Sequence, residues 1–297
     1  MSAAPDGRGV VLAAYGRSAL VLTGAHAQHC GLIGRNLHLV CGDVVHWRRD
    51  PSADTPSVHS VEPRRNCVER IDARGRAEPV AANVDRLAIV VAPEPRTDWF
   101  LVDRYWAAAL QYAMDATLIV NKSDLDQTSM AGEIDNYRRL GLACAPISCR
   151  ADGGLRPLRD LLGTGATLLV GQSGVGKSTL VNALVPAAAA QTAELAGDGE
   201  GRHTTSTARR YRLDAGAAIV DAPGVRDFAP PSRLARAAER GFVEILARSV
   251  ACRFRDCRHL EEPGCAVRST LESGGIAPRR YESYRRLVRL YAGFASR

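Results

Sequence analysis

The amino-acid sequence predicts a multidomain α/β protein, and three observations support this prediction. Before residue 81, short alternating apolar segments are separated by turn residues, which favours a small β-barrel. Between residues 81 and 228, apolar strand patterns alternate with helical patterns, which is typical of a doubly wound sheet. Between residues 229 and 297, a cysteine–histidine cluster precedes an amphipathic helix. We therefore expect three domains: 1–80, 81–228 and 229–297.

The length and composition restrict the class of protein. A chain of 297 residues can form two or three domains. No apolar run approaches the roughly 20 residues that cross a bilayer, and the first residues lack the pattern of a secretory signal. We expect a cytoplasmic protein with no membrane partner, in which the eight cysteines are thiols or metal ligands rather than disulfides.

The net charge of +7 is concentrated at the C-terminal end of the chain. Residues 225–297 contain 15 arginines against 8 acidic residues. Such a region suits an acidic partner, and a nucleic acid is the simplest one. A solvated basic face is the alternative.

The N-terminal segments "GVVLAAYG", "SALVLTG" and "CGDVVHWR" read as short strands, and an OB-type barrel is the leading candidate. Tyr15 and Trp47 are its only aromatic residues, so base stacking would be sparse. Contact with protein alone is the alternative to contact with RNA. The arginines that can follow a phosphate backbone are Arg64, Arg65, Arg70, Arg74 and Arg76.

In the central region, "GQSGVGKST" follows the apolar run "ATLLVG" and opens a helical pattern. This strand–loop–helix context predicts a phosphate loop. Lys177 is expected to reach the β and γ phosphates, and the Ser178 hydroxyl to bind Mg²⁺. The residues expected to bind the nucleotide here are Gly171, Gln172, Ser173, Gly174, Val175, Gly176, Lys177, Ser178 and Thr179.

A second motif, "LIVNKSDL", indicates selection of guanine. The Asp124 carboxylate can accept hydrogen bonds from guanine N1–H and from the exocyclic amine, a pair that adenine does not offer. Asn121 can tie this loop to the phosphate loop, and Lys122 can lie along the base plane. "CAPISCR" then ends a short strand at Ser148 and Cys149, where a backbone N–H can meet guanine O6.

Lysine usage supports both motifs. Of the 39 Lys and Arg residues, only Lys122 and Lys177 are lysines. A phosphate loop needs a compact ammonium that a planar guanidinium does not replace. Accidental matches would not be expected to contain both lysines.

Two further segments resemble the switches of a GTPase. In "AAIVDAPGV", Asp221 is positioned to hold Mg²⁺ and the Gly224 N–H to meet the γ-phosphate. In "GRHTT", Thr204 and Thr205 can complete the metal shell when a γ-phosphate is present. The segment before "GRHTT" is small and polar, so we expect a mobile loop there, and a plain linker is the alternative.

The catalytic group is less evident. Many GTPases carry a glutamine directly after Asp-x-x-Gly, and this chain has Val225 there, which cannot hydrogen bond to water. His203 is the nearest candidate in sequence to replace the glutamine. The alternative is that His203 only packs the switch.

The motifs occur in the order base, phosphate, switch, whereas the usual order begins with the phosphate loop. A doubly wound sheet often has neighbouring termini, so circular permutation is physically possible. We therefore predict a circularly permuted P-loop GTPase domain, cut between the Asp-x-x-Gly strand and the Asn-Lys-x-Asp strand.

The C-terminal region contains Cys252, Cys257, His259 and Cys265, separated by four, one and five residues. Three thiolates and an imidazole satisfy a tetrahedral Zn²⁺, so we expect one zinc ion per chain. Three buried cysteines with an unrelated histidine are the alternative. An amphipathic helix follows, with Tyr281, Tyr284, Leu287, Leu290 and Tyr291 on its apolar side.

Together these motifs resemble the ribosome small subunit-dependent GTPase A family, the circularly permuted bacterial GTPases of small-subunit biogenesis. The resemblance rests on "CGDVVHW", "AANVDRL", "NKSDL", "GQSGVGKSTLVNAL", "GRHTT", "DAPGVRDF" and the cysteine–histidine cluster. It implies an OB domain, a permuted GTPase domain and a zinc-binding helical domain. It also implies GTP and GDP as ligands, docking on the small ribosomal subunit and its rRNA late in maturation, and hydrolysis linked to release. Ala222 and Cys149 depart from the family pattern, as do the N-terminus, which lacks the long basic extension of some members, and the short C-terminal helix.

The leading hypothesis is a monomeric GTPase that acts as an assembly checkpoint. An RNA-binding module that uses GTP as an affinity switch with little turnover is the alternative. An ATP-dependent RNA-acting enzyme is a third possibility, against which Asn121 and Asp124 argue.

Overall fold

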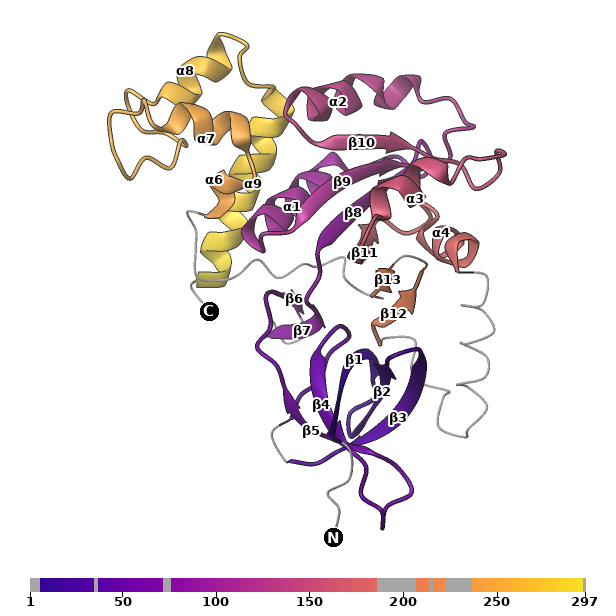
Figure 1. Cartoon of the computed structure of the whole chain (residues 1–297). Coiled ribbons are helices and arrows are strands. Elements are labelled where there is room, and N and C mark those ends of the chain that lie inside the picture. The colour runs from indigo at the N-terminus through magenta and orange to yellow at the C-terminus, as the bar shows by residue number, and fades with distance from the viewer. Residues whose placement is uncertain are drawn as a thin grey trace.

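The computed structural model describes residues 6–34, 37–71, 76–185, 207–213, 216–222 and 237–295, and the account that follows concerns these residues. Figure 1 shows a β-barrel nearest the N-terminus, a central sheet with helices on both faces, and a helical region beside the sheet. The predicted three-part architecture is confirmed.

The N-terminal barrel is closed by five strands in the order β1-β2-β3-β5-β4. Its apolar positions alternate along each strand, so that Val11, Val21, Val45 and Val58 fill the interior. The predicted OB-type barrel is therefore confirmed. The strands are β1 (Asp6–Ala14), β2 (Ser18–Thr23), β3 (His26–Leu32), β4 (Val44–Arg48) and β5 (Ser57–Val61).

A separate two-stranded sheet, β6 (Cys67–Ile71) and β7 (Ala77–Ala82), lies between the barrel and the central sheet (Figure 1). The Asn66 side chain stabilises the exit from this hairpin, because it donates to Val84 O at 2.7 Å and accepts from Val84 N at 2.9 Å. The boundary expected after residue 80 lies within β7, and the domain limits remain a prediction.

The central sheet has six strands in the order β10-β9-β8-β11-β13-β12, all parallel except β12. Buried apolar residues cover both of its faces, as a doubly wound sheet requires. The strands are β8 (Arg86–Val91), β9 (Asp115–Val120), β10 (Ala143–Pro146), β11 (Gly165–Gly171), β12 (Arg209–Arg212) and β13 (Ala217–Asp221).

Helices lie on both sides of this sheet. Residues of α1 (Trp99–Gln111) and α2 (Thr128–Arg139) pack in one apolar cluster. Residues of α3 (Arg156–Leu162) and α4 (Lys177–Leu184) pack in the other. Strand β11 pairs with β8 on one side and with β13 on the other, so the strand that leads to the phosphate loop is central although three strands of the sheet precede it in sequence. This is the arrangement that circular permutation predicts.

The C-terminal region consists of α6 (Ala237–Arg240), α7 (Val243–Ser249), α8 (Ala266–Glu272) and α9 (Pro278–Ala295). Its core contains Phe242, Ile245 and the apolar side of α9, including Tyr284 and Leu287. Helix α1 contacts both α6 and α9, so the C-terminal region packs directly against the central domain (Figure 1). Among the helices of the described residues, none combines the length and apolar character of a membrane span.

A buried ionic cluster joins α9 to α1. Arg280 is fully buried, and its guanidinium contacts Asp103 Oδ1 at 2.5 Å and Glu244 Oε1 at 2.8 Å. Arg279 binds the other Asp103 oxygen at 2.7 Å, and the Tyr137 hydroxyl donates to Asp103. Composition alone does not predict this cluster, because its members are far apart in sequence.

Candidate nucleotide and metal sites

The phosphate loop joins the end of β11 to the start of α4. Gly171 has φ +145°, and a Cβ there would lie 2.2 Å from Val90 O. Gly176 has φ +98°, and a Cβ there would lie 2.4 Å from Asn121 Nδ2. Both positions therefore require glycine, for conformation and for space.

The residues expected to bind phosphate and magnesium lie at this loop and on the neighbouring strand. Lys177 and Ser178 begin α4, where free backbone N–H groups favour an anion. Lys177 Nζ donates to Gly171 O at 2.8 Å and to Gln172 O at 2.6 Å. Asp221 ends β13, paired with β11, and burial raises its pKa while the charge of Lys177 opposes that effect. The Ser178 hydroxyl and the Asp221 carboxylate are the oxygen donors that suit Mg²⁺.

The guanine motif lies beside the phosphate loop, at the carboxyl end of β9. Asn121 Nδ2 donates to Val175 O at 2.8 Å, which ties the two loops together as the sequence suggested. Lys122 has φ +57°, and its Nζ donates to Glu94 O at 2.6 Å and to Gly174 O at 3.0 Å. The pocket between these loops has a volume of about 410 Å³. Its lining residues are Glu94, Asn121, Lys122, Asp124, Leu125, Ser148, Cys149, Arg150, Gly176 and Thr179.

Asp124 is oriented by the segment that follows β10. Ser148 Oγ donates to Asp124 Oδ1 at 2.6 Å, and it accepts from the backbone N–H groups of Arg150 at 3.1 Å and Ala151 at 3.3 Å. The hydrogen bond from Ser148 is the main cause that lowers the pKa of Asp124. Asp124 therefore stays ionised at neutral pH and can accept from guanine. Cys149 is half-buried in the same pocket, and burial raises the pKa of its thiol.

One wall of the nucleotide pocket was missed by sequence reasoning: the loop 92–98 after β8. Gln172, which belongs to the phosphate loop, hydrogen bonds to the backbone of this loop. Its Oε1 accepts from Asp98 N at 2.8 Å, and its Nε2 donates to Arg96 O at 3.3 Å. In the same loop, the backbone carbonyl of Glu94 accepts from Lys122 Nζ. The sequence could have indicated this loop by its position directly after β8, because ligands of parallel α/β sheets bind at the carboxyl ends of the strands.

We predict that Gln172→Ala weakens the affinity for GDP about tenfold, because two hydrogen bonds that hold the loop 92–98 are lost. Titration with a fluorescent GDP analogue measures this change. Gln127→Ala is the matched control, since that side chain makes no capping hydrogen bond at the start of α2 and should leave the affinity unchanged. If Gln172→Ala and the unmodified protein bind GDP with equal affinity, the hydrogen bonds from Gln172 to the loop 92–98 do not support nucleotide binding.

Four of the predicted catalytic residues, His203, Thr204, Thr205 and Gly224, lie outside the described residues. Asp221 is the one catalytic candidate whose surroundings are described.

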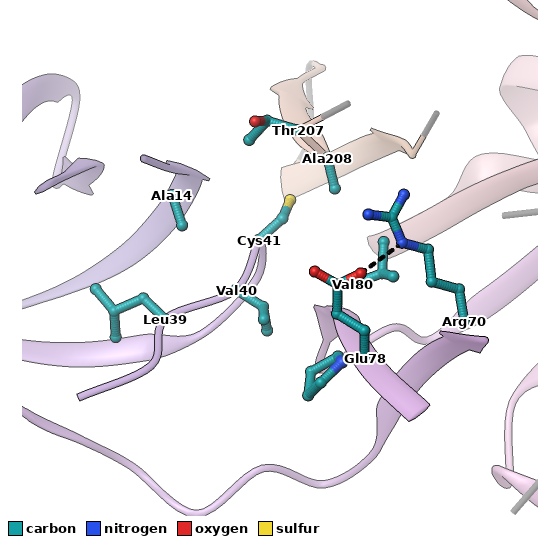
Figure 2. Close-up of a pocket in the computed structure, with 10 residues that line it drawn as sticks. Ala14, Leu39, Val40, Cys41, Arg70, Glu78, Val80, Thr207 and Ala208 are labelled. Atoms are coloured by element: carbon teal, nitrogen blue, oxygen red, sulfur yellow. Dashed lines mark hydrogen bonds and ion pairs between the residues drawn. The ribbon is translucent and has the colours of Figure 1, made fainter. Parts of the chain in front are cut away.

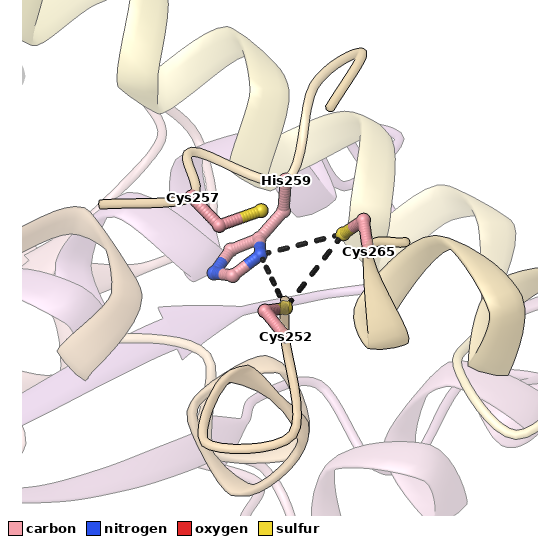
Figure 3. Close-up of side chains that lie close together, drawn as sticks. All are labelled: Cys252, Cys257, His259 and Cys265. Atoms are coloured by element: carbon pink, nitrogen blue, oxygen red, sulfur yellow. Dashed lines mark hydrogen bonds between the residues drawn. The ribbon is translucent and has the colours of Figure 1, made fainter. Parts of the chain in front are cut away.

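The cysteine–histidine cluster converges in the C-terminal region, as Figure 3 shows. The ligand atoms of Cys252, Cys257, His259 and Cys265 all lie within 4.8 Å of one another. Cys252 Sγ and Cys265 Sγ are 3.9 Å apart, and each is 3.5 Å from His259 Nδ1. A tetrahedral zinc site requires roughly 3.8 Å between sulfurs and roughly 3.5 Å between sulfur and nitrogen. The donor set and its spacing therefore fit a zinc ion.

The surroundings of the cluster also suit a metal. Burial opposes ionisation of Cys252, yet backbone N–H groups of Val267 and Ala266 at the start of α8 outweigh it and lower the pKa of this thiol. Burial also disfavours a charged His259, but Glu239 and Cys265 raise its pKa to about 9. His259 Nε2 lies 3.5 Å from Glu239 Oε1, on the side away from the thiols. A carboxylate behind the imidazole is a common outer partner of zinc-binding histidines.

We predict that the purified protein contains one zinc ion per chain and that Cys252→Ser with Cys257→Ser reduces this content to near zero, because two of the four ligands are removed. Elemental analysis after gel filtration measures it. The matched control replaces Cys67 and Cys144, two free thiols outside the cluster, and should retain the metal. Zinc retained by the Cys252 and Cys257 variant would contradict the ligand assignment.

Comparisons with known proteins agree with the family resemblance of the sequence motifs. The family model described as RsgA GTPase matches residues 61–230. The Small ribosomal subunit biogenesis GTPase RsgA of Azotobacter vinelandii is 39% identical over 295 residues, which cover 96% of this chain and 85% of that protein. The protein of the same name from Pseudomonas aeruginosa strain LESB58 is 39% identical over 290 residues, with coverages of 96% and 85%.

Two solved structures share the fold. The crystal structure of YjeQ from Thermotoga maritima matches with a TM-score of 0.75 and 25% identity, covering 97% of this chain and 99% of that chain. YloQ, described as a circularly permuted GTPase, matches with a TM-score of 0.73 and 22% identity, covering 97% and 96%.

The family model spans more than half of the chain, and both RsgA relatives cover nearly all of it. The resemblance drawn from the motifs is thereby confirmed. The chain therefore belongs to the RsgA GTPase family and is a GTP hydrolase.

Proposed function

We propose that this GTPase binds the small ribosomal subunit and assists or checks its late maturation. GTP is hydrolysed to GDP and phosphate, the subunit stimulates hydrolysis, and hydrolysis serves release. The observation that carries the proposal is the direct packing of one GTPase domain against a barrel and against a helical region with a zinc-type cluster. The relatives named Small ribosomal subunit biogenesis GTPase RsgA span all three parts at 39% identity.

The residues of the nucleotide pocket have distinct proposed roles. Asp124, held by Ser148, selects guanine, and Asn121 keeps the base pocket aligned with the phosphate loop. Lys177 and the loop backbone bind the phosphates, and Ser178 and Asp221 would hold Mg²⁺, which supplies charge neutralisation on the phosphates when bound. For Thr204, Thr205 and Gly224, contact with the γ-phosphate or its metal remains a proposal from the sequence.

The C-terminal region supplies a surface that suits rRNA. Cys252, Cys257, His259 and Cys265 would hold one zinc ion per chain, and Arg253, Arg255 and Arg258 come between these ligands in sequence. Phe254 is 40% exposed, and the Arg253 guanidinium lies 5.4 Å from the centre of its ring. Exposed aromatic and guanidinium groups bind unpaired bases and phosphates. We propose that the protein acts as a monomer in the cytoplasm.

Two measurements test this function. The first compares GTP turnover with and without purified small subunits, and we expect stimulation of about 10² or more. The second compares co-sedimentation with small subunits in a non-hydrolysable GTP analogue and in GDP, and we expect binding mainly with the analogue. Binding without any stimulation would favour an RNA-binding module that uses GTP only as an affinity switch. Absence of both effects would remove the ribosomal role.

We predict that His203→Ala loses most of the subunit-stimulated turnover while its affinity for GTP is unchanged. The reason is that Val225, directly after the Asp-x-x-Gly motif, cannot orient water, so another group must do so. Single-turnover hydrolysis with subunits present, alongside GTP binding, measures both quantities. Unchanged stimulation in the variant would move the catalytic role to the rRNA, to a subunit protein or to another residue of this chain.

A further inference from the structure

A cavity of about 270 Å³ lies at the junction of the barrel, the loops that precede β8, and β12. Three arginines line it: Arg8 from β1, Arg65 from the loop after β5, and Arg210 from β12. Two carboxylates, Glu62 and Asp85, line it as well. Figure 1 shows β12 directly beside the barrel strands, and β12 contacts β1. We call this cavity the junction pocket.

Two of the three arginines have carboxylate partners. Arg8 forms a bidentate ion pair with Glu62, in which Nε donates to Oε1 at 2.6 Å and Nη2 donates to Oε2 at 3.0 Å. Arg65 Nη2 donates to Asp85 Oδ1 at 2.6 Å, while the other Asp85 oxygen accepts from Ala166 N at 2.7 Å. These contacts use both carboxylates of the pocket.

Arg210 has no such partner. Its guanidinium makes no hydrogen bond or ion pair with any residue in the part of the chain that the structure describes. The side chain is partly buried. Burial lowers its pKa, the charge of Asp85 across the pocket opposes that effect, and the charge of Arg65 adds to it. A partly buried guanidinium that has no hydrogen-bonding partner in the described part of the chain is open to an anion, which can approach it from the pocket. Among the described residues that line the pocket, three arginines face two carboxylates, which leaves an excess of one positive charge.

The neighbouring pocket provides a contrast. Figure 2 shows it between the barrel, the β6–β7 hairpin and the residues just before β12, with a volume of about 200 Å³. Among the described residues that line it, Arg70 is the one cation, and it is paired with Glu78 at 2.9 Å. The uncompensated charge therefore distinguishes the junction pocket from the adjacent one.

We propose that the junction pocket binds a phosphate group, with Arg210 as its principal ligand and Arg8 and Arg65 beside it. The planar guanidinium matches two phosphate oxygens with two parallel hydrogen bonds. The cavity volume exceeds what one phosphate group needs. The group is either a free phosphate or the backbone phosphate of RNA, and the RNA source rests on the proposed ribosomal function.

The position of Arg210 gives this site a connection to the nucleotide. Strand β12 pairs with β13, with Arg210 opposite Val220 and Arg209 opposite Asp221. Asp221 is the expected magnesium ligand. A phosphate held by Arg210 would thus bind the same strand pair that carries the metal-binding carboxylate.

The first arm of the test measures thermal unfolding in inorganic phosphate at constant ionic strength. Saturating GDP and Mg²⁺ keep the phosphate loop occupied. The unmodified protein should gain about 2 °C or more in Tm with phosphate. Arg210→Gln should lose this gain and, without phosphate, unfold at about the same temperature, because the guanidinium makes no hydrogen bond or ion pair in the described part of the chain.

Arg212→Gln is the matched control, since Arg212 is exposed on the same strand and should leave the gain intact. Arg210→Lys keeps the charge and should keep part of the gain, which guards against a Gln variant that fails to fold. No gain in the unmodified protein, or an equal gain in Arg210→Gln, would overturn the proposal.

The second arm measures binding of a twelve-nucleotide RNA as a function of salt. If RNA supplies the phosphate, Arg210→Gln should reduce the slope of log K against log salt by about 0.7, the value of one phosphate contact on a single strand. A phosphate-dependent gain in Tm with an unchanged RNA slope supports the site and assigns it to a free phosphate. Failure of co-sedimentation with small subunits would leave the first arm unaffected, so the two proposals fail separately.

Discussion

Asp103→Ala is expected to lower the free energy of unfolding by about 3–5 kcal/mol, the usual cost of removing one partner from a buried ion pair. Asp103 is fully buried and accepts from Arg279, Arg280 and Tyr137. Its loss leaves the Arg280 guanidinium, which has no solvent exposure, with Glu244 as the one carboxylate partner that remains among the described residues. Guanidinium chloride unfolding at fixed zinc and GDP concentrations measures the change.

The matched control is Asp135→Ala on α2. Asp135 pairs with Arg138 at 3.1 Å, but both side chains are largely exposed, so the expected change is within about 0.5 kcal/mol. If Asp103→Ala and Asp135→Ala shift the unfolding midpoint equally, the buried cluster does not stabilise the contact between α1 and α9.

This cluster also has a structural consequence for the nucleotide pocket. Helix α1 begins after Asp98, whose N–H is bound by Gln172 of the phosphate loop, and its buried face carries Asp103. Arg280 on α9 therefore binds α1, the same helix whose N-terminal end contacts the phosphate loop. One rigid element thus joins the phosphate loop to the C-terminal region.

Asp124→Asn is expected to weaken GTP binding about 10³-fold, because two hydrogen bonds from guanine to a charged carboxylate are lost. Xanthosine triphosphate should bind better to the variant than GTP does, since the new amide can donate to the C2 carbonyl of xanthine. Ser148 can still donate to the remaining oxygen, so the pocket itself should persist. Competition against a fluorescent nucleotide measures both affinities.

Asp126→Asn is the control for this change. Asp126 lies two residues further on, where it accepts from Thr128 N at 2.9 Å and is exposed. It does not line the guanine pocket, so both nucleotide affinities should stay as they are. Full GTP affinity in Asp124→Asn would show that the base-selecting residue has been assigned wrongly.

The elements whose chemistry depends on a few residues at short spacing can be predicted from the amino-acid sequence. A phosphate loop needs glycine at positions such as Gly171 and Gly176, because a Cβ would collide with neighbouring atoms, and this requirement is visible in the motif. A tetrahedral metal site needs four suitable ligands near one another, and the spacing from Cys252 to Cys265 displays them. The alternation of the barrel strands and the permuted order of the motifs then defined the fold class. The roles of His203 and of the two switch threonines remain predictions.

Contacts between residues that are distant in the chain cannot be predicted in this way and are seen only in the folded protein. Asp103 and Arg280 are separated by 177 positions, and Gln172 and Asp98 by 74. In sequence, Arg280 and Arg210 look like any other arginine of a basic chain, whether solvated or buried. Their environments follow from how α9 packs on α1 and how β12 meets the barrel, and burial decides whether a charge needs a partner, because the cost of removing it from water depends on everything that surrounds it.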